Sequence, residues 1–415
     1  YKADLGKNVI YHSFDFTAPE TVSGGGIVNL PEMNGGVPVY AVDEFGSPLL
    51  DPLGREQLAY ENARRVRLLP QPKSKAVDSK NKTVLVTLYR QGEEGHGKAA
   101  DIFMRRITLG APGNPYAYKN FVPEAQNVSS VEPGDTMTFT VEDPGTGAQT
   151  QITKMINWTW DTKNLSDQSG TEPYSDARAH RGALNGDELI IGFIWTPNWG
   201  RLANDKYDLY VRRSWDGGNS WKTDPKGAGP IDHTIVFVDP ITKEETVTIT
   251  SYDPGVLEPP RNISNLRNNR ITVLEPRIVK TPGTIKQPDG TTSYDEDKRN
   301  GKIYQVAWGL EVNDPGGMPD DQGQTIPYRA PLDIYYGRTT DKGQHFEKVI
   351  ITRADGQGRP EEGWNLLAKD RPGQSGAQIR QTPDGSRIYA VWVEKTAEGG
   401  DIMFRRVDYR PAPTQ

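Results

Sequence analysis

The chain has 415 residues, among them 43 glycines, 32 prolines and no cysteine, and 49 Lys and Arg against 55 Asp and Glu give a net charge of −6. The absence of cysteine excludes disulfides, thiolate metal sites and cysteine nucleophiles, and the charge balance lacks the basic surface typical of nucleic-acid binding. No apolar run approaches the length of about 18 residues that a membrane-spanning helix needs. This content of glycine and proline suits many short strands joined by turns.

The N-terminal region, residues 1–60, is rich in glycine and proline and carries only short apolar pieces. We expect an entry segment here, with room for a strand that closes a ring of sheets. The first four residues, Tyr-Lys-Ala-Asp, do not resemble a signal peptide. We therefore expect that a signal was removed or that the chain is part of a longer protein.

A six-residue pattern then recurs: Asp, an aliphatic residue, two apolar residues, Arg or Gly, and Arg. Its copies lie at 101–106, 208–213, 333–338 and 401–406. Each copy follows a strand-like run that ends in an aromatic residue, at 84–89, 189–195, 303–308 and 388–392. A supersecondary unit repeated every few tens of residues without helical periodicity is typical of a β-propeller. We expect the Asp pattern to form the third strand of each blade, with these aliphatic residues buried: Ile102, Leu209, Ile334 and Ile402.

The sequence thus predicts an all-β fold, a β-propeller over residues 61–415 with long loop insertions. Four blades are centred near 61–110, 175–225, 272–350 and 376–409. The insertions at about 111–174 and 226–271 contain strand-like runs, so each is either a degenerate blade or a long loop. Counting both as blades gives six, the number we expect, and five or seven blades also fit.

One turn carries a recognisable motif. After the third strand at 208–213 the chain reads Ser-Trp-Asp-Gly-Gly-Asn-Ser-Trp, and a partial copy, Thr-Thr-Asp-Lys-Gly-Gln-His-Phe, follows the strand at 333–338. The first copy resembles the Asp-box, or BNR repeat, of the sialidase-like β-propeller superfamily. The resemblance implies a structural role for Ser214, Asp216, Gly218, Trp221, Asp341 and Gly343. We expect Asp216 to accept backbone amides of its own turn, Gly218 to adopt positive φ and Trp221 to be buried.

Arginines recur at the starts of the first strands. The copies read Asn-Ala-Arg at 62–64, Asp-Ala-Arg at 176–178, Glu-Pro-Arg at 275–277 and Gly-Ala-Gln at 376–378. Because first strands line the axis of a propeller, we expect Arg64, Arg178 and Arg277 to converge there. Three guanidiniums suit a carboxylate or sulfate, which each can bind through two parallel hydrogen bonds. The alternative is that Asp176 and Glu275 pair with the arginines and close the channel.

Three further residues complete the candidate ligand site, and each has a structural alternative. His180 is either a ligand contact or a satisfied polar residue at a strand start. Trp199 either stacks on a sugar ring or caps the end of its blade. Glu311 belongs to an acidic segment, 309–332, that is either a solvated loop or a Ca²⁺ site. Because the five histidines lack metal-ligand spacing, we expect no zinc site, and we expect no cofactor.

The family resemblance raises the question of catalysis. Sialidases hold the substrate carboxylate with an arginine triad and use an acid Asp and a Tyr nucleophile with a Glu partner. Here Arg64 is followed by Arg-Val instead of the Ile-Pro of the family, and no nucleophile or acid can be assigned. Glycoside hydrolysis in general needs two carboxylates either about 5 Å or about 6.5–9.5 Å apart, for which Asp176, Glu275 and Glu311 are candidates.

A looser resemblance covers residues 177–199 and 261–283, which look like segments of large bacterial surface propellers called choice-of-anchor proteins. It implies export, and a precursor with an export signal and an anchor. The sequence therefore favours a secreted or cell-surface, non-catalytic binding or assembly module whose partner is a surface glycan or another extracellular protein. The alternatives are a sialidase-like glycoside hydrolase acting on an anionic sugar and a structural subunit of an extracellular filament.

Overall fold

All regular secondary structure described in this chain is β-strand, β1 to β25. The computed structural model describes residues 8–14, 22–29, 33–34, 37–59, 62–71, 83–92, 100–109, 126–127, 136–142, 149–155, 174–185, 188–199, 207–218, 220–238, 244–268, 271–281, 284–286, 289, 292–294, 303–319, 325–346, 365–367, 373–383, 385–396 and 398–409. In these ranges no helix has the length and apolar character needed to cross a membrane. The expectation of an all-β fold is confirmed.

Four larger antiparallel sheets form the body. Sheet I consists of β5 (Asn62–Gln71), β6 (Thr83–Gly92), β7 (Ala100–Leu109) and β8 (Gln126–Asn127). Sheet II consists of β11 (Tyr174–Asn185), β12 (Glu188–Trp199), β13 (Asp208–Ser214) and β16 (Arg261–Asn262). Sheet III consists of β17 (Ile271–Lys280), β20 (Tyr304–Pro319), β21 (Thr325–Thr339) and β22 (Asn365–Leu366), and sheet IV of β23 (Gln374–Gln381), β24 (Arg387–Thr396) and β25 (Gly399–Asp408). The four Asp patterns all lie in third strands, as expected.

The remaining strands form two-stranded pairs. These are β1 (Ile10–Phe14) with β2 (Val22–Ile27), β3 (Met33–Asn34) with β4 (Val37–Pro38), β9 (Thr136–Glu142) with β10 (Gln149–Met155), β14 (Ile231–Val238) with β15 (Glu245–Tyr252), and β18 (Thr284–Lys286) with β19 (Thr292–Tyr294). Where described, the insertions 111–174 and 226–271 thus contribute two hairpins and the short outer strands of sheets I and II. The described residues show four blade-like sheets where we expected six.

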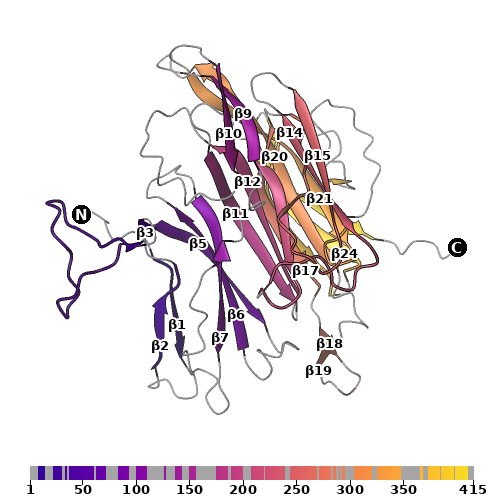
Figure 1. The fold of residues 1–415 in the computed structure, drawn as a ribbon. Helices are drawn as coiled ribbons and strands as arrows, with labels where there is room; N and C mark the ends of the chain where they lie inside the picture. The colour runs from indigo at the N-terminus through magenta and orange to yellow at the C-terminus, as the bar shows by residue number, and fades with distance from the viewer. Residues whose placement is uncertain are drawn as a thin grey trace.

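The four sheets follow one another in chain order, with their first strands side by side. β11 lies beside β5 and β17, and β17 lies beside β23. Figure 1 shows the sheets as a row that runs from the N-terminal side of the molecule to the C-terminal side. The described residues thus form a propeller-like succession of blades, and they do not show a closed ring.

Each interface between neighbouring sheets is an apolar core. Ile102 of sheet I packs with Phe193 of sheet II, Leu209 of sheet II with Trp308 of sheet III, and Ile334 of sheet III with Trp392 of sheet IV. Burial of a side chain of this size stabilises the fold by about 1.5–3 kcal/mol. The aliphatic residue of the Asp pattern is therefore the anchor of each interface.

Sheet IV departs from this pattern. Ile402, the counterpart of the three buried aliphatic residues, is exposed, so the expectation that it is buried is wrong. The cause is the position of sheet IV at the end of the row. No described element covers the face of this sheet that points away from sheet III.

The entry segment covers the opposite end of the row. Val9 and Val28, which flank the hairpin β1–β2, pack against Tyr89 and Phe103 of sheet I. The Val28 carbonyl accepts hydrogen bonds from Tyr89 Oη at 3.3 Å and from Arg105 Nη1 at 2.8 Å. Val9 and Val28, side by side at the open end of the hairpin, thus cover part of the face of sheet I that points away from sheet II. A ring-closing contact with sheet IV lies outside what the described residues show.

The turn after β13 has the geometry expected of its sequence. Asp216 Oδ1 accepts the backbone amide of Ser220 at 2.8 Å, and the Ser214 hydroxyl accepts the amide of Gly218 at 2.8 Å. Gly218 has φ +97°, and an added Cβ would lie 2.9 Å from Met104 of sheet I. Trp221 is buried in the core between sheets I and II. The predicted backbone bond, positive φ and burial are all confirmed.

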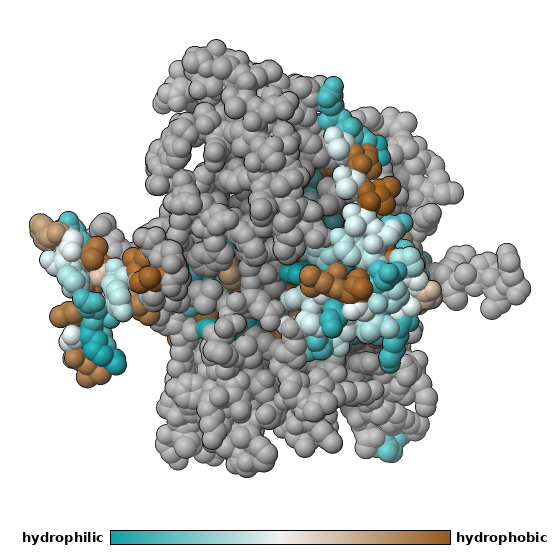
Figure 2. All heavy atoms as spheres, viewed as in Figure 1, coloured by the Kyte–Doolittle hydropathy of each residue, from teal (hydrophilic) through white to brown (hydrophobic). Residues whose placement is uncertain are grey.

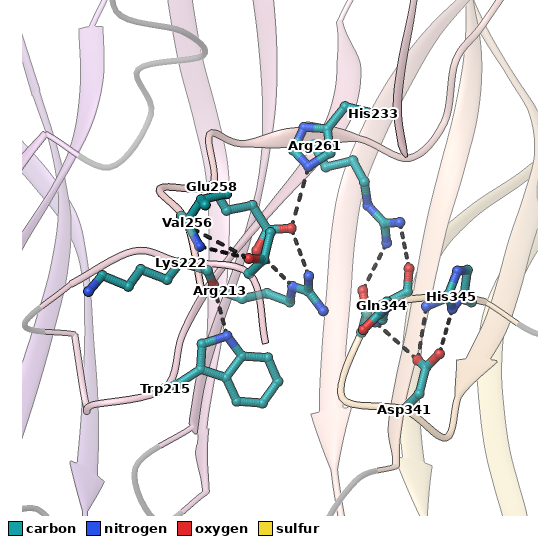
Figure 3. A network of polar contacts seen from close by, with 12 residues as sticks. Arg213, Trp215, Lys222, His233, Val256, Glu258, Arg261, Asp341, Gln344 and His345 are labelled. Atoms are coloured by element: carbon teal, nitrogen blue, oxygen red, sulfur yellow. Dashed lines mark hydrogen bonds and ion pairs between the residues drawn. The ribbon is translucent and has the colours of Figure 1, made fainter. Parts of the chain in front are cut away.

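The partial copy after β21 folds in the same way. Asp341 Oδ1 accepts the amides of Gln344 at 3.0 Å and His345 at 2.9 Å, and Gly343 has φ +82°. Arg261 of sheet II donates to the carbonyl oxygens of Gly343 at 2.8 Å and Gln344 at 2.5 Å, as Figure 3 shows. The turn of sheet III is therefore tied to sheet II.

A buried ion cluster lies within sheet II and its neighbouring hairpin (Figure 3). Glu258 accepts from Arg213 Nε at 3.1 Å and Nη2 at 2.7 Å, and His233 Nε2 lies 3.4 Å from Glu258 Oε1. The burial of Glu258 would raise its pKa, yet Arg213 and His233 outweigh burial and hold the pKa below its usual value. The cluster joins β13, the hairpin β14–β15 and the segment before β16.

Candidate anion-binding site

The first strands of the four sheets share a backbone irregularity. Each has a β-bulge at the same place in its sheet, where the register with the second strand shifts. One residue within each bulge has positive φ: Arg65 (57°), Ala179 (56°), Glu275 (32°) and Gly376 (65°). A left-handed residue at a bulge re-aims the side chains that follow it. These four residues therefore mark the equivalent positions of the four strands.

The residue two positions after the left-handed residue is arginine in three strands and glutamine in the fourth: Arg67, Arg181, Arg277 and Gln378. Each of these pairs with an equivalent residue of its second strand: Leu88, Gly192, Ala307 and Val391. We name Arg67, Arg181 and Arg277 the arginine row. Only Arg277 belongs also to the trio expected from the sequence.

The expected alignment of Arg64, Arg178 and Arg277 is thus corrected. Arg64 and Arg178 precede the left-handed residues of their strands, whereas Arg277 follows its own. The sequence analysis aligned the Ala-Arg dipeptides with Pro-Arg at 276–277. Relative to the left-handed residue of each strand, however, Arg64 and Arg178 lie three positions earlier than Arg277. The structure brings Arg277 together with Arg67 and Arg181 instead.

The charges of the arginine row act on one another. Arg181 has a pKa lowered to about 10, first because it is largely buried and then because of the positive charges of Arg277 and Arg67. Glu275 opposes this shift, and Arg65 adds to it. The fourth equivalent residue, Gln378, accepts from Arg277 Nη2 at 2.9 Å and Nε at 3.2 Å when its amide oxygen faces the guanidinium. The four residues therefore occupy equivalent positions of the four first strands, and Arg277 contacts its neighbour Gln378.

Among the residues that the structure describes, one carboxylate, that of Glu275, neighbours the arginine row. Glu275 Oε2 lies 2.8 Å from Arg277 Nη2, and this hydrogen bond is the main reason why the pKa of Glu275 is lowered. Arg181 Nη1 donates to the His180 carbonyl at 2.8 Å, and Arg67 Nη1 donates to the Val66 carbonyl at 3.4 Å.

Within the described part of the chain neither Arg67 nor Arg181 has a carboxylate within 4.0 Å. Three guanidiniums and one carboxylate leave an excess of two positive charges (3 − 1 = 2). An arrangement of this kind attracts an anion.

Asp176 belongs to a different, buried cluster. This carboxylate accepts from Arg90 Nη2 at 2.6 Å, the Ala100 amide at 2.7 Å and Tyr207 Oη at 2.6 Å, and Arg178 Nε lies 3.2 Å away. Arg178 also contacts the Tyr207 hydroxyl and lies over its ring, 3.8 Å from the ring centre.

Arg64 lies near the same carboxylate. The pKa of Arg64 is lowered by burial and by Arg90, and the charge of Asp176 opposes that shift. This cluster joins sheets I and II. Asp176 pairs with Arg178, as the structural alternative expected, and the closure of a channel stays a prediction. Glu275 likewise pairs with an arginine of the expected trio, because it contacts Arg277.

The remaining residues of the expected site are a buried histidine, a tryptophan whose side chain lies outside the described residues, and a glutamate distant from Arg277. His180 is buried. Its burial is the main cause that lowers its pKa to about 3, and the positive charges of Arg67 and Arg181 add to this shift, so His180 is neutral at pH 7. Trp199 is the last residue of β12, and its side chain lies outside the described residues. Glu311 lies in β20 opposite Thr272, four residues from Ala307, the partner of Arg277. That separation is about 13 Å along the strand.

The segment expected to be a loop at 309–332 is mostly strand, because β20 runs to Pro319 and β21 begins at Thr325. Arg67 and Arg181 were missed by the sequence comparison. Only the fourth strand carries a sequence signal for the left-handed position, Gly376, which lies two residues before Gln378. The counterparts in the other three strands are Arg65, Ala179 and Glu275, so the sequence offers no glycine on which to align Arg67, Arg181 and Arg277.

Comparison with known proteins adds little to this geometry. No family model and no curated protein sequence matches the chain. The mannose phosphorylase MPT-4 from Leishmania mexicana is 10% identical, with a TM-score of 0.22 over 83% of this chain and 89% of its own. A GH43 endo-arabinanase from Bacillus licheniformis is 10% identical, with a TM-score of 0.23 over 82% and 92%. A levansucrase mutant from B. megaterium is 8% identical, with a TM-score of 0.23 over 84% of each chain. Likenesses this weak carry no argument about this chain.

Proposed function

We propose that this chain is a non-catalytic binding module that recognises an anionic group through the arginine row. The single observation that supports the proposal is the placement of Arg67, Arg181 and Arg277 at equivalent positions of three sheets, with Glu275 as the one acidic neighbour among the described residues. A planar guanidinium binds a carboxylate or sulfate through two parallel hydrogen bonds. The ligand class is therefore a carboxylated or sulfated one, such as a surface glycan or an acidic segment of another extracellular protein.

The states of Glu275, beside the arginine row, and of Asp176, in its separate cluster, support binding rather than hydrolysis. A glycosidase needs one carboxyl group that is protonated to act as the general acid. The pKa of Glu275 is lowered by Arg277, so Glu275 is ionised at neutral pH and unsuited to that role. Asp176 is fully buried, and its oxygens accept hydrogen bonds from three donors. The alternative function, a sialidase-like hydrolase of an anionic sugar, would use the same arginines for binding and a catalytic pair elsewhere.

We extend the proposal to the cellular setting. The turns at 214–221 and 339–346 have the bonding and left-handed glycines that their Asp-box resemblance implies. That resemblance, together with the likeness to choice-of-anchor proteins, supports a secreted or cell-surface protein. A module of this kind would use its arginine row to hold an anionic partner outside the cell.

The test is binding of three polysaccharides by calorimetry: one sulfated, one carboxylated and one neutral. We expect the sulfated or the carboxylated chain to bind and the neutral one not to bind, with affinity that falls as salt screens the charges. Arg181→Gln should weaken binding about tenfold or more, which corresponds to about 1.4 kcal/mol. The control is Lys226→Gln, because Lys226 is exposed in a turn of sheet II.

Equal affinity of the parent and Arg181→Gln would overturn the proposed site. Release of reducing sugar or sialic acid from an anionic glycan by the parent would overturn the non-catalytic assignment in favour of the hydrolase. These two outcomes are independent, since the first concerns the arginine row and the second concerns turnover.

A further inference from the structure

Residues 37–59 form a small projecting unit, which we name the knob. It is built on an eight-residue repeat: Asp-Glu-Phe-Gly-Ser at 43–47 and Asp-Pro-Leu-Gly-Arg at 51–55. Asp43 Oδ1 accepts the amides of Phe45 and Ser47, both at 2.9 Å, and Asp51 Oδ1 accepts those of Leu53 and Arg55 at 2.8 and 3.0 Å. The two turns are therefore structural copies of each other.

The backbone of the knob closes on itself with the same period. The amide of Ala41 donates to the Gln57 carbonyl, that of Gln57 to the Leu49 carbonyl and that of Leu49 to the Ala41 carbonyl, each at 2.8 Å. This ring of hydrogen bonds holds the unit together without help from the four sheets. The knob is thus a defined structure rather than an irregular loop.

Each turn of the knob presents a large apolar side chain to solvent. Phe45 is 84% exposed and Leu53 is 76% exposed, at the same position of the repeat. Tyr40, Val42 and Leu50 are also exposed, and Figure 2 shows the knob standing out from the body at the left. Single exposed apolar residues are common, whereas a repeated set on one projecting unit marks an interaction surface.

Sheet IV presents a second exposed apolar surface. Val391 lies opposite Phe404 and Val393 opposite Ile402 in the register of β24 and β25. Ile402 is 81% exposed and Phe404 is 65% exposed. The counterparts of Ile402 in sheets I to III are each buried under the following sheet. This face therefore has the composition of a sheet interface, and no described element covers it.

The two surfaces differ in charge. The knob carries Asp43, Glu44, Asp51 and Glu56 against Arg55, which gives −3 (1 − 4). On the face of sheet IV that carries Val391, Val393, Ile402 and Phe404, the exposed charged residues of the strands are Arg380, Arg387, Lys395 and Arg406 against Asp408, which gives +3 (4 − 1). Opposite net charge favours contact between the two surfaces and disfavours contact of either surface with its own kind.

The two surfaces also lie at opposite ends of the molecule. In Figure 1 the knob lies beyond the N-terminal side of sheet I, and sheet IV lies at the C-terminal side. The knob therefore does not reach sheet IV of its own chain, and the surface that complements it is on another copy.

We propose that the knob of one copy docks on the open face of sheet IV of the next copy, in a head-to-tail assembly. Phe45 and Leu53 would cover Ile402 and Phe404, in place of the following sheet that covers the equivalent residues of sheets I to III. An interface between two unlike surfaces leaves one free knob and one free face, so it continues into a ring or a filament. The inference is independent of the arginine row.

The test is sedimentation velocity of the full chain and of two double variants, up to about 100 μM, a range that detects weak association. The knob variant is Phe45→Ser with Leu53→Ser, and the face variant is Ile402→Ser with Phe404→Ser. The matched control is Ile249→Ser, an exposed apolar residue of β15 outside both surfaces. Unchanged thermal unfolding of each variant shows that the fold is retained, as expected for exposed positions.

The expected result has three parts. The parent and the control form dimers and longer species as concentration rises. Each double variant alone associates at least about tenfold more weakly than the parent. An equimolar mixture of the two variants stops at the dimer, because one intact knob and one intact face remain and meet only once.

Any of three results would overturn the proposal. The first is a parent that stays monomeric throughout the concentration range. The second is a face variant that is monomeric while the knob variant associates like the parent, which would indicate contact between two copies of sheet IV. The third is a mixture of the variants that does not form dimers although the parent does.

Discussion

Nη2 of Arg277 lies 2.8 Å from Oε2 of Glu275, only two residues earlier on the same strand. The left-handed conformation of Glu275 at the bulge, with φ 32°, accompanies this contact. Glu275 therefore acts as a built-in counter-ion for one end of the arginine row, while Arg67 and Arg181 donate to backbone carbonyls. A ligand anion at the row would compete with Glu275 for Arg277.

The first prediction follows from that competition. Glu275→Gln should strengthen binding of the anionic polysaccharide several-fold, about 1 kcal/mol, because it removes the negative charge beside Arg277. Calorimetry at low salt measures the change. Glu311→Gln is the control, since it removes a carboxylate from β20 well away from Arg277. If both variants strengthen binding equally, the effect reflects overall charge and the competition model is wrong.

The second prediction concerns the turn at 214–221. Asp216→Ala should lower the free energy of unfolding by about 1–3 kcal/mol, because the partly buried turn loses the acceptor of the Ser220 amide. Urea denaturation followed by tryptophan fluorescence measures it. Asp224→Ala, in an exposed turn where Asp224 accepts one amide, should cost about 0.5 kcal/mol or less. Equal costs for the two variants would contradict a special role for Asp216.

The third prediction concerns the buried carboxylate between sheets I and II. Asp176→Asn should lower the free energy of unfolding by about 3–5 kcal/mol, because Arg90 and Arg178 lose a charged partner in a buried place. The same denaturation experiment measures this loss. Asp232→Asn, at an exposed carboxylate that bonds only Ser251 among the described residues, should have little effect. A small loss for Asp176→Asn would show that the cluster is open to water.

The fourth prediction is a pH dependence. The folded pKa of His180, about 3, lies below its ordinary value of 6.5, because of burial and then of Arg67 and Arg181. In the window between these values the unfolded chain binds a proton that the folded chain does not bind. Stability must therefore fall as the pH drops through 6.5 toward 3.

Between about pH 7.5 and about pH 5 this single histidine should cost roughly 2 kcal/mol. The measurement compares the pH dependence of unfolding for the parent and for His180→Gln, which cannot bind the proton. The variant should lose less stability than the parent over this range, whatever its stability at pH 7.5. Parallel pH profiles would show that folding does not lower the pKa of His180.

Much of the fold follows from local sequence. The Asp pattern at 101–106 and its three repeats predict third strands. Each pattern alternates its side chains as a strand does, and each follows a strand that ends in an aromatic residue, so the prediction needs only one strand and the strand before it. The turn after β13 is equally local. Ser214, Asp216 and Gly218 lie within five residues, so their bonds depend on the sequence of the turn alone.

The relation between distant strands does not follow in the same way. The arginines that come together are determined by the β-bulges, each of which adds a residue and changes which side chains share a face. Arg64 and Arg67 lie three residues apart, and the sequence allows either one to be aligned with the arginines of the other first strands. Only the left-handed backbone of Arg65 decides between the two alignments. Sequence similarity cannot detect that conformation where the left-handed residue is arginine, alanine or glutamate instead of glycine.

The sequence by itself determined the strand type, the order of strands within each sheet and the Asp-centred turns, because these depend on contacts between residues close in the chain. The tertiary structure decided the arginine row and the exposure of Ile402. Four copies of the Asp pattern carry nearly the same residues, yet Ile102 is buried and Ile402 is exposed. The difference is the presence of a following sheet, and burial depends on what covers a residue rather than on the residue itself.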